Sequence, residues 1–246
     1  PFRYPGAAAD ELEHISFKVE KGQTLAIIGA TGSGKTTLAS LIPRFYDATA
    51  GTVLVDGLDV REYTSDALYN KLGYVTQKAV LFSGTVEDNV FFGQSAAEKT
   101  DASLQAALSL SQAAEFVDKY PEKAAHPIAQ LGRNVSGGQK QRLSIARALA
   151  RKPEILIFDD SFSALDYKTD ATLREGLAKE LPGTTKIIVA QRISTIRNAD
   201  QILVLDRGEI AGLGTHDALM ASCTVYREIA MSQLSEEELK KGGASK

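Results

Sequence analysis

The sequence predicts an α/β fold with a mainly parallel sheet, and three observations support this prediction. The chain has 246 residues, of which 43% are hydrophobic, so it can bury a sizeable core. Short apolar runs at 155–158, 186–189 and 201–205 are separated by segments of helical periodicity, and that alternation favours parallel strands with right-handed crossovers. A glycine-rich turn that begins at residue 29 joins another apolar run to a helical segment.

The expected elements follow in order along the chain. Residues 15–28 alternate between apolar and polar side chains and then run apolar, which predicts strands leading into the glycine-rich turn. A helix is expected over 36–45, ending near Pro43. Further strands are expected at 52–55, before a tight turn at Asp56–Gly57, and at 72–76.

The middle of the chain has a different character. From Thr85 to Ala150 the sequence is rich in Ala, Leu and Gln with helical periodicity, which Pro121 and Pro127 interrupt. A helical subdomain is therefore expected within the α/β core. The expected division is a core at 1–85 and 153–231, a helical subdomain at 86–152 and a charged, frayed tail at 232–246.

The glycine-rich turn is the strongest chemical signal. Residues 29–36 match G-x-x-x-x-G-K-[ST] between a strand and a helix, the context of a phosphate-binding loop. Its glycines let backbone N–H groups close around phosphate oxygens, Lys35 adds a positive charge and Thr36 offers a hydroxyl to Mg²⁺. A plain glycine-rich turn seldom carries Lys-Thr-Thr at the head of a helix, so a nucleoside triphosphate site is predicted. Its residues are Gly29, Ala30, Thr31, Gly32, Ser33, Gly34, Lys35, Thr36 and Thr37.

Two carboxylates, Asp159 and Asp160, follow the apolar run 155–158. Open α/β sheets bind ligands beyond the carboxyl ends of their strands. One carboxylate there can hold the Mg²⁺ shell while the adjacent one faces an attacking water. A solvated strand end is the alternative interpretation, and the phosphate loop upstream favours the chemical one.

A second glycine-rich motif, Ser136-Gly137-Gly138, opens a strongly helical run. It offers N–H groups, a hydroxyl and the positive end of a helix to an anion. A loop with an N-capping serine is the alternative interpretation. Two phosphate-reading elements in one chain suggest that each nucleotide is shared between two copies of the fold.

Composition excludes several other classes of protein. A formal net charge of -3 gives no electrostatic attraction to nucleic acid or anionic lipid. Cys223 is the only cysteine, so no disulfide framework or Cys-based metal site is expected, and a reducing compartment fits. No apolar stretch approaches the ~18 residues of a membrane span. The chain opens at Pro1, which suggests a domain excised from a longer protein.

These motifs, in this order, resemble the nucleotide-binding domain of ABC transporters over nearly the whole chain. The segments 77–85 and 214–219 look like the exporter forms of that domain. The resemblance implies a P-loop NTPase fold with a RecA-like core, an antiparallel β portion and an inserted α-helical subdomain. It also implies the cofactors ATP and Mg²⁺.

The resemblance further implies individual roles. Tyr4 would stack on adenine, and Gln77 would contact Mg²⁺ and the attacking water while sensing the transmembrane part. Thr36, Gln77 and Asp159 would contact the metal, with Asp160, Gln191 and Gln77 as the catalytic set. Val135, Ser136, Gly137, Gly138 and Gln139 would form the signature that caps the nucleotide of the opposite subunit, and Ser163, Ala164, Leu165 and Asp166 the D-loop.

Some positions depart from the family pattern. The family usually has Glu where this chain has Asp160, and His where it has Gln191. Asp is shorter by one C–C bond, roughly 1.5 Å, and misplacement by about 1 Å can cost on the order of 10²-fold in rate. Gln191 cannot titrate as an imidazole does. Val135 replaces the Leu that is usual in the signature. Gln130 replaces a Glu that exporters often carry in the segment facing the other subunit's transmembrane part.

The two coordinated departures suggest the degenerate half of a heterodimeric exporter. Its own ATP site would turn over slowly, while its signature would complete the competent site of a different partner subunit. A slowly hydrolysing homodimer and an ATP-dependent clamp that never turns over are the alternatives.

The resemblance also implies where the chain works. The partners would be a second nucleotide-binding domain and a transmembrane part that contacts the surface near Phe82. The fragment itself would be soluble and would act at the cytoplasmic face of the plasma membrane. A soluble ABC ATPase of DNA or ribosomes is disfavoured, because such proteins would show tandem domains, a long coiled coil or a basic face.

Overall fold

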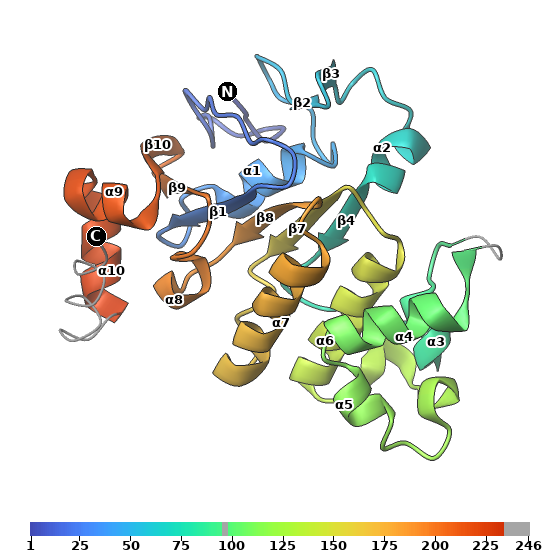
Figure 1. The fold of residues 1–246 in the computed structure, drawn as a ribbon. Helices are drawn as coiled ribbons and strands as arrows, with labels where there is room; N and C mark the ends of the chain where they lie inside the picture. The colour runs from blue at the N-terminus through green and yellow to red at the C-terminus, as the bar shows by residue number, and fades with distance from the viewer. Residues whose placement is uncertain (95–97, 234–246) are drawn as a thin grey trace. The chain divides into compact units, whose positions relative to one another are not determined.

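The computed structural model describes residues 1–94 and 98–233 (Figure 1). By its contacts the chain divides into two compact units. Unit 1 comprises residues 1–69 and the chain from 185 onward, and unit 2 comprises residues 70–184. The expected charged tail at 232–246 lies outside the described residues except for its first two positions.

The sheet of unit 1 is built on β1 (Thr24–Gly29), which is buried along almost its whole length. It pairs in parallel with β8 (Thr185–Val189) on one side and β9 (Gln201–Asp206) on the other. The last strand, β10 (Glu209–Gly214), pairs antiparallel with β9. Near-continuous burial of β1, β8 and β9 is typical of parallel strands covered on both faces.

Helices cover this sheet. The helix α1 (Lys35–Leu41) contacts β1 and β8, and α10 (Thr224–Gln233) contacts β1 and β9. The remaining elements of unit 1 are the hairpin β2 (Leu54–Val55) and β3 (Leu58–Asp59), α2 (Ser65–Lys71, which runs on into unit 2), α8 (Ile193–Ile196) and α9 (His216–Ser222).

Unit 2 combines a parallel strand pair with helices. Strand β4 (Leu72–Val75) pairs with β7 (Ile155–Asp159), and α6 (Gly137–Ala150) contacts β4. Helices α3 and α4 pack on α6. The other elements are α3 (Val86–Val90), α4 (Asp101–Leu110), α5 (Ala114–Val117), α7 (Tyr167–Glu180), the pair β5 (Gly84–Thr85) and β6 (Pro127–Ile128), and the 3₁₀ turns η2 (Lys123–Ala125) and η3 (Gln130–Gly132).

The mainly parallel pairing is confirmed in both units, and several boundaries differ from the expectation. The strand expected at 52–55 comprises only Leu54–Val55, and the strand expected at 72–76 ends at Val75. The strand before the phosphate loop occupies only 24–29, and residues 15–20 have no regular secondary structure. The helix after the loop ends at Leu41 rather than at Phe45. It ends there because Arg44 is left-handed, with φ +58°, and the N–H of Phe45 donates to the carbonyl of Ser40 at 3.0 Å, a Schellman closure.

His216, the first residue of α9, is buried. Its Nδ1 lies 2.7 Å from the hydroxyl oxygen of Tyr226 on α10. Burial, aided by the positive charge of Arg197 and opposed by Asp217, lowers the pKa of His216 from its ordinary value of 6.5. The folded state therefore binds fewer protons than the unfolded state near pH 6. Stability should be fully present above pH 6.5 and should fall as the pH drops below that value.

Urea unfolding at pH 7.5 and pH 5.5 checks this prediction. The loss of unfolding free energy on acidification should shrink in His216→Gln, because the replacement does not titrate in this range. His14→Gln is the matched control, since the His14 side chain is 82% exposed. An equal pH dependence in wild type and His216→Gln would contradict the prediction.

Candidate nucleotide site

The glycine-rich loop lies in unit 1, between β1 and α1. Gly29 ends β1, and a Cβ there would overlap the carbonyl oxygen of Leu205 on β9. Gly34 has a left-handed φ of +94°, and a Cβ there would lie 2.6 Å from the Cδ2 atom of Leu12. Glycine is therefore required at 29 by the backbone of the neighbouring strand and at 34 chiefly by the left-handed φ.

Lys35 folds back over its own loop. Its Nζ donates to the carbonyls of Gly29 and Ala30, at 2.9 and 2.7 Å, and the residue is only 9% exposed. Ser33 Oγ is buried and has no hydrogen-bond partner among the described residues. Thr36, at the second position of α1, is exposed. The loop therefore gathers an ammonium, a buried hydroxyl with no acceptor in the described part of the chain and an exposed hydroxyl, a donor set that fits phosphate oxygens.

Tyr4 belongs to an aromatic cluster in the same unit. Its ring meets Phe2 edge to face at 4.8 Å and Tyr46 at 5.2 Å. Its hydroxyl shares a 2.8 Å hydrogen bond with Oγ1 of Thr37. The structure thus brings Tyr4 to the helix that follows the phosphate loop, which no sequence pattern could indicate.

Gln191 follows β8 by two residues and is exposed. Its carbonyl oxygen accepts a 2.7 Å hydrogen bond from the Nε2 of Gln233 on α10. Gln233 could not be predicted from the sequence, because it lies 42 positions from Gln191 and no local pattern connects the two residues.

The predicted carboxylates lie in unit 2. Asp159 is the last residue of β7 and is 4% exposed. Its Oδ2 accepts a 3.2 Å hydrogen bond from the hydroxyl of Tyr74 on the neighbouring strand β4. Burial, with the charge of Asp159 adding to it, raises the pKa of Tyr74 well above its ordinary value, so the phenol stays protonated and donates.

Asp160 turns the chain sharply after β7. Its φ is +46°, a left-handed value that Asp tolerates better than most residues. Its Oδ2 accepts a 3.0 Å hydrogen bond from the Nε2 of Gln77, and its carbonyl accepts one from the Ser163 hydroxyl at 2.7 Å. The structure thus brings together two residues of the predicted catalytic set, Gln77 and Asp160.

The second glycine-rich motif opens α6 in unit 2. Ser136 is the N-cap, and it forms a capping box with Gln139: Ser136 Oγ accepts from the Gln139 N–H at 3.3 Å, and Gln139 Oε1 accepts from the Ser136 N–H at 2.8 Å. Gly137 and Gly138 form the first turn, and Val135 is buried. The N-cap interpretation is therefore correct as local structure.

The predicted D-loop follows β7. Ser163 and Ala164 are exposed and Leu165 is buried. Asp166 is the N-cap of α7, where its carboxylate accepts hydrogen bonds from the N–H and the hydroxyl of Thr169. These hydrogen bonds lower the pKa of Asp166. A Cβ at Gly138 would come within 3.5 Å of the Ala164 carbonyl, so the D-loop and the signature are close neighbours.

Two polar side chains of α6, the buried Gln141 and the half-buried Arg147, hold the segments on either side of Gln77. Neither was among the residues predicted from the sequence. Gln141 on α6 donates to the carbonyl of Thr76 at 3.2 Å. Arg147, further along α6, donates to the carbonyls of Asn89 and Val80 at 2.8 and 3.0 Å. A polar or charged side chain in a helical segment was the only indication in the sequence of such a contact, and it does not indicate which backbone carbonyl the side chain meets.

An aromatic pair lies beside Arg147. The rings of Phe82 and Phe92 stack at 4.3 Å, although the two residues are 44% and 51% exposed. The Arg147 guanidinium lies over both rings, at 5.4 and 5.6 Å from their centroids. Phe82 is therefore part of an exposed aromatic surface rather than a core residue.

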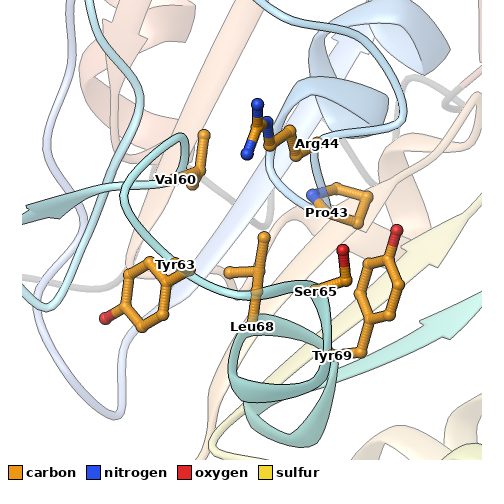
Figure 2. Close-up of a pocket in the computed structure, with 7 residues that line it drawn as sticks. All are labelled: Pro43, Arg44, Val60, Tyr63, Ser65, Leu68 and Tyr69. Carbon is orange, nitrogen blue, oxygen red and sulfur yellow. The ribbon is translucent and has the colours of Figure 1, made fainter.

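A separate hollow of about 230 Å³ lies in unit 1. Figure 2 shows its lining, which includes Tyr63, Tyr69 and the guanidinium of Arg44. That guanidinium is paired with Asp47 at 2.7 Å. The positive charge at this hollow is therefore already paired within the chain.

Comparison with known proteins identifies the family of this chain. A family model described as ABC transporter matches residues 12–163. An uncharacterised ABC transporter ATP-binding protein of Mycobacterium tuberculosis is 49% identical over 233 residues, which is 94% of this chain and 40% of that protein. An ATP-dependent lipid A-core flippase of Aromatoleum aromaticum is 42% identical over 236 residues, 96% of this chain and 39% of that protein.

A solved structure is also similar. A bacterial Atm1-family ABC exporter with ATP bound matches with a TM-score of 0.90 and 37% identity, over 96% of this chain and 41% of the other. This chain belongs to the ABC transporter family, and it has the mixed α/β P-loop NTPase fold of the ATP-binding domain of an ABC exporter. It spans about 40% of the length of these relatives. Among the described residues, every helix is too short or too polar to cross a bilayer.

Proposed function

We propose that this chain is the motor domain of an ABC exporter whose own ATP site is impaired in hydrolysis. It binds Mg-ATP through the phosphate loop and contributes its signature to the competent site of a different partner subunit. The phosphate loop carries the binding part of the proposal, because it presents Lys35, the buried Ser33 hydroxyl and glycine backbone to an anion.

The metal that accompanies ATP fits residues of this chain by their chemistry. Mg²⁺ prefers oxygen ligands, and the Asp159 carboxylate and the Thr36 hydroxyl are oxygen donors. The family resemblance implies both as ligands, with Gln77 as a further contact. Mg²⁺ would neutralise phosphate charge there. Tyr74 supports this role of Asp159 by holding one carboxylate oxygen in place.

The impairment is inferred from Asp160 and Gln191. The Asp160 carboxylate already accepts a hydrogen bond from Gln77, and it is one methylene shorter than the Glu usual at this position. Gln191 offers an amide where the family has an imidazole; this amide would hydrogen-bond the γ-phosphate, but it cannot titrate. Both changes weaken the activation of water and leave phosphate binding intact, since the loop is unaltered.

The remaining partners follow from the same reasoning. The exposed pair Phe82 and Phe92, with Arg147 behind it, fits a surface that receives cytoplasmic helices of a transmembrane part. The head-to-tail mate would be a second nucleotide-binding domain, and the assembly would work at the cytoplasmic face of the membrane.

Nucleotide trapping on mixed subunits tests the proposal. The chain should bind Mg-ATP in a titration, and Lys35→Ala should weaken that binding at least tenfold because the phosphate charge is no longer met. In a pair with an ABC exporter subunit that has Glu and His at the positions of Asp160 and Gln191, radiolabelled ATP should remain uncleaved on this chain while ADP accumulates on the mate. Equal cleavage on both loops would overturn the impaired-site proposal, and absence of ATP binding would overturn the whole assignment.

A further inference from the structure

The C-terminal helix α10 presents one continuous face to the rest of unit 1. Tyr226 and Ala230 are fully buried on it, and α10 contacts α8, β1 and β9. Gln233 follows at the spacing i, i+4, i+7, which places it on the same helix face. Figure 1 shows α10 as the last labelled helix of the chain.

Gln233 holds the backbone of the loop that follows β8. Its Oε1 accepts the N–H of Ile193 at 2.9 Å, and its Nε2 donates to the carbonyl of Gln191 at 2.7 Å. One side-chain amide thus meets a backbone acceptor and a backbone donor two residues apart. Such a two-point contact fixes the position and the orientation of the backbone between them.

The helix that begins at this loop lacks a cap of its own. Ile193 is the first residue of α8, and the N-cap Arg192 makes no side-chain capping hydrogen bond. The first N–H groups of a helix have no partner within the helix. Gln233 supplies a partner to the Ile193 N–H from a position 40 residues further along the chain.

We propose that Gln233 is a positioning residue for Gln191, and that α10 thereby sets how the site distinguishes ATP from ADP. The inference rests on the proposed function, in which Gln191 contacts the γ-phosphate. Gln233 fixes the carbonyl of Gln191 and thereby restricts the backbone position from which the Gln191 side chain extends. Without the two hydrogen bonds, the loop would sample several positions, and only the contact with the third phosphate would weaken.

Gln233→Ala in the full chain is the main test, with two readouts. Hydrogen exchange should accelerate about fivefold to tenfold at the Ile193 amide, as expected for loss of one net hydrogen bond. Titration with Mg-ATP and Mg-ADP should show an ATP-to-ADP affinity ratio lowered about threefold to tenfold, with ADP affinity unchanged within twofold. Met231→Ala is the matched control, because this neighbour is 58% exposed; it should alter neither readout.

Two further variants make the test specific. Gln233→Glu keeps the acceptor for Ile193 and replaces the donor to Gln191 with a carboxylate oxygen, so it should lower the ratio at least as much as Gln233→Ala. Gln191→Ala should lower the ratio by itself, and adding Gln233→Ala to it should change the ratio no further, since the two residues act through one contact.

Each outcome decides the matter. Unchanged hydrogen exchange at Ile193 in Gln233→Ala would show that Gln233 does not protect this amide. Faster exchange with an unchanged ATP-to-ADP affinity ratio would show that Gln233 has only a structural role. Either result would overturn the inference. Additive effects of the two substitutions would overturn it as well. If the wild-type chain binds neither nucleotide, the proposed function fails and the inference falls with it, while the exchange data separately report on the Gln233 contact.

Discussion

The double variant Asp160→Glu, Gln191→His is expected to hydrolyse ATP about 10²-fold faster than the wild-type chain. The longer glutamate side chain would extend the carboxylate toward the attacking water, and the imidazole would add a titrating group beside the γ-phosphate. Turnover at saturating Mg-ATP, measured over a range of protein concentrations, checks this result, because a head-to-tail pair must form first.

Single substitutions and a matched isostere complete this experiment. Each single variant should gain less than the pair, since both groups act on the same step. Asp160→Asn keeps the shape of the side chain and removes the base, so it should show no gain. A wild-type rate already near ~1–10 s⁻¹, typical of competent enzymes, would contradict the impaired site, as would a double variant no faster than wild type.

Gly29→Ala is expected to lower the free energy of unfolding by about 3 kcal/mol, at the upper end of overpacking effects. The added methyl group would overlap the carbonyl oxygen of Leu205, which belongs to the neighbouring strand β9 and is fixed by the ladder with β1. Urea unfolding without nucleotide measures the loss. Because the clash is internal to the sheet, the loss should be present even before any ligand is added.

Gly183→Ala is the control for this prediction. No atom lies within 4 Å of a Cβ at Gly183, and its φ is not left-handed. Its stability should therefore stay within about 0.5 kcal/mol of wild type, as at most surface sites. A Gly29→Ala chain as stable as Gly183→Ala would show that β1 and β9 can move apart at no cost, and would remove the packing explanation for this glycine.

Much of the fold could be predicted because its signals are local. The phosphate loop, the strand before Asp159 and the helix opened by Ser136 each depend on residues that are adjacent in sequence. The structure has all of them. The error at Phe45 concerns a helix end, where a left-handed residue such as Arg44 can stop a helix although no glycine marks the position. At 15–20 the alternating pattern predicted a strand, whereas the structure has no regular secondary structure there.

The amino-acid sequence alone determined the class of this protein: an α/β chain with a phosphate loop, two carboxylates after a buried strand and a signature helix. Those features can be recognised from residues that are close together in the sequence, because glycine flexibility, side-chain charge and hydrophobic periodicity act over a few residues. Only the tertiary structure decided which groups meet: Tyr74 with Asp159, Gln77 with Asp160, and Gln233 with the backbone around Gln191. These pairs are separated by 40 to 85 positions, and hydrogen bonds over such separations exist only after packing has brought the strands and helices together.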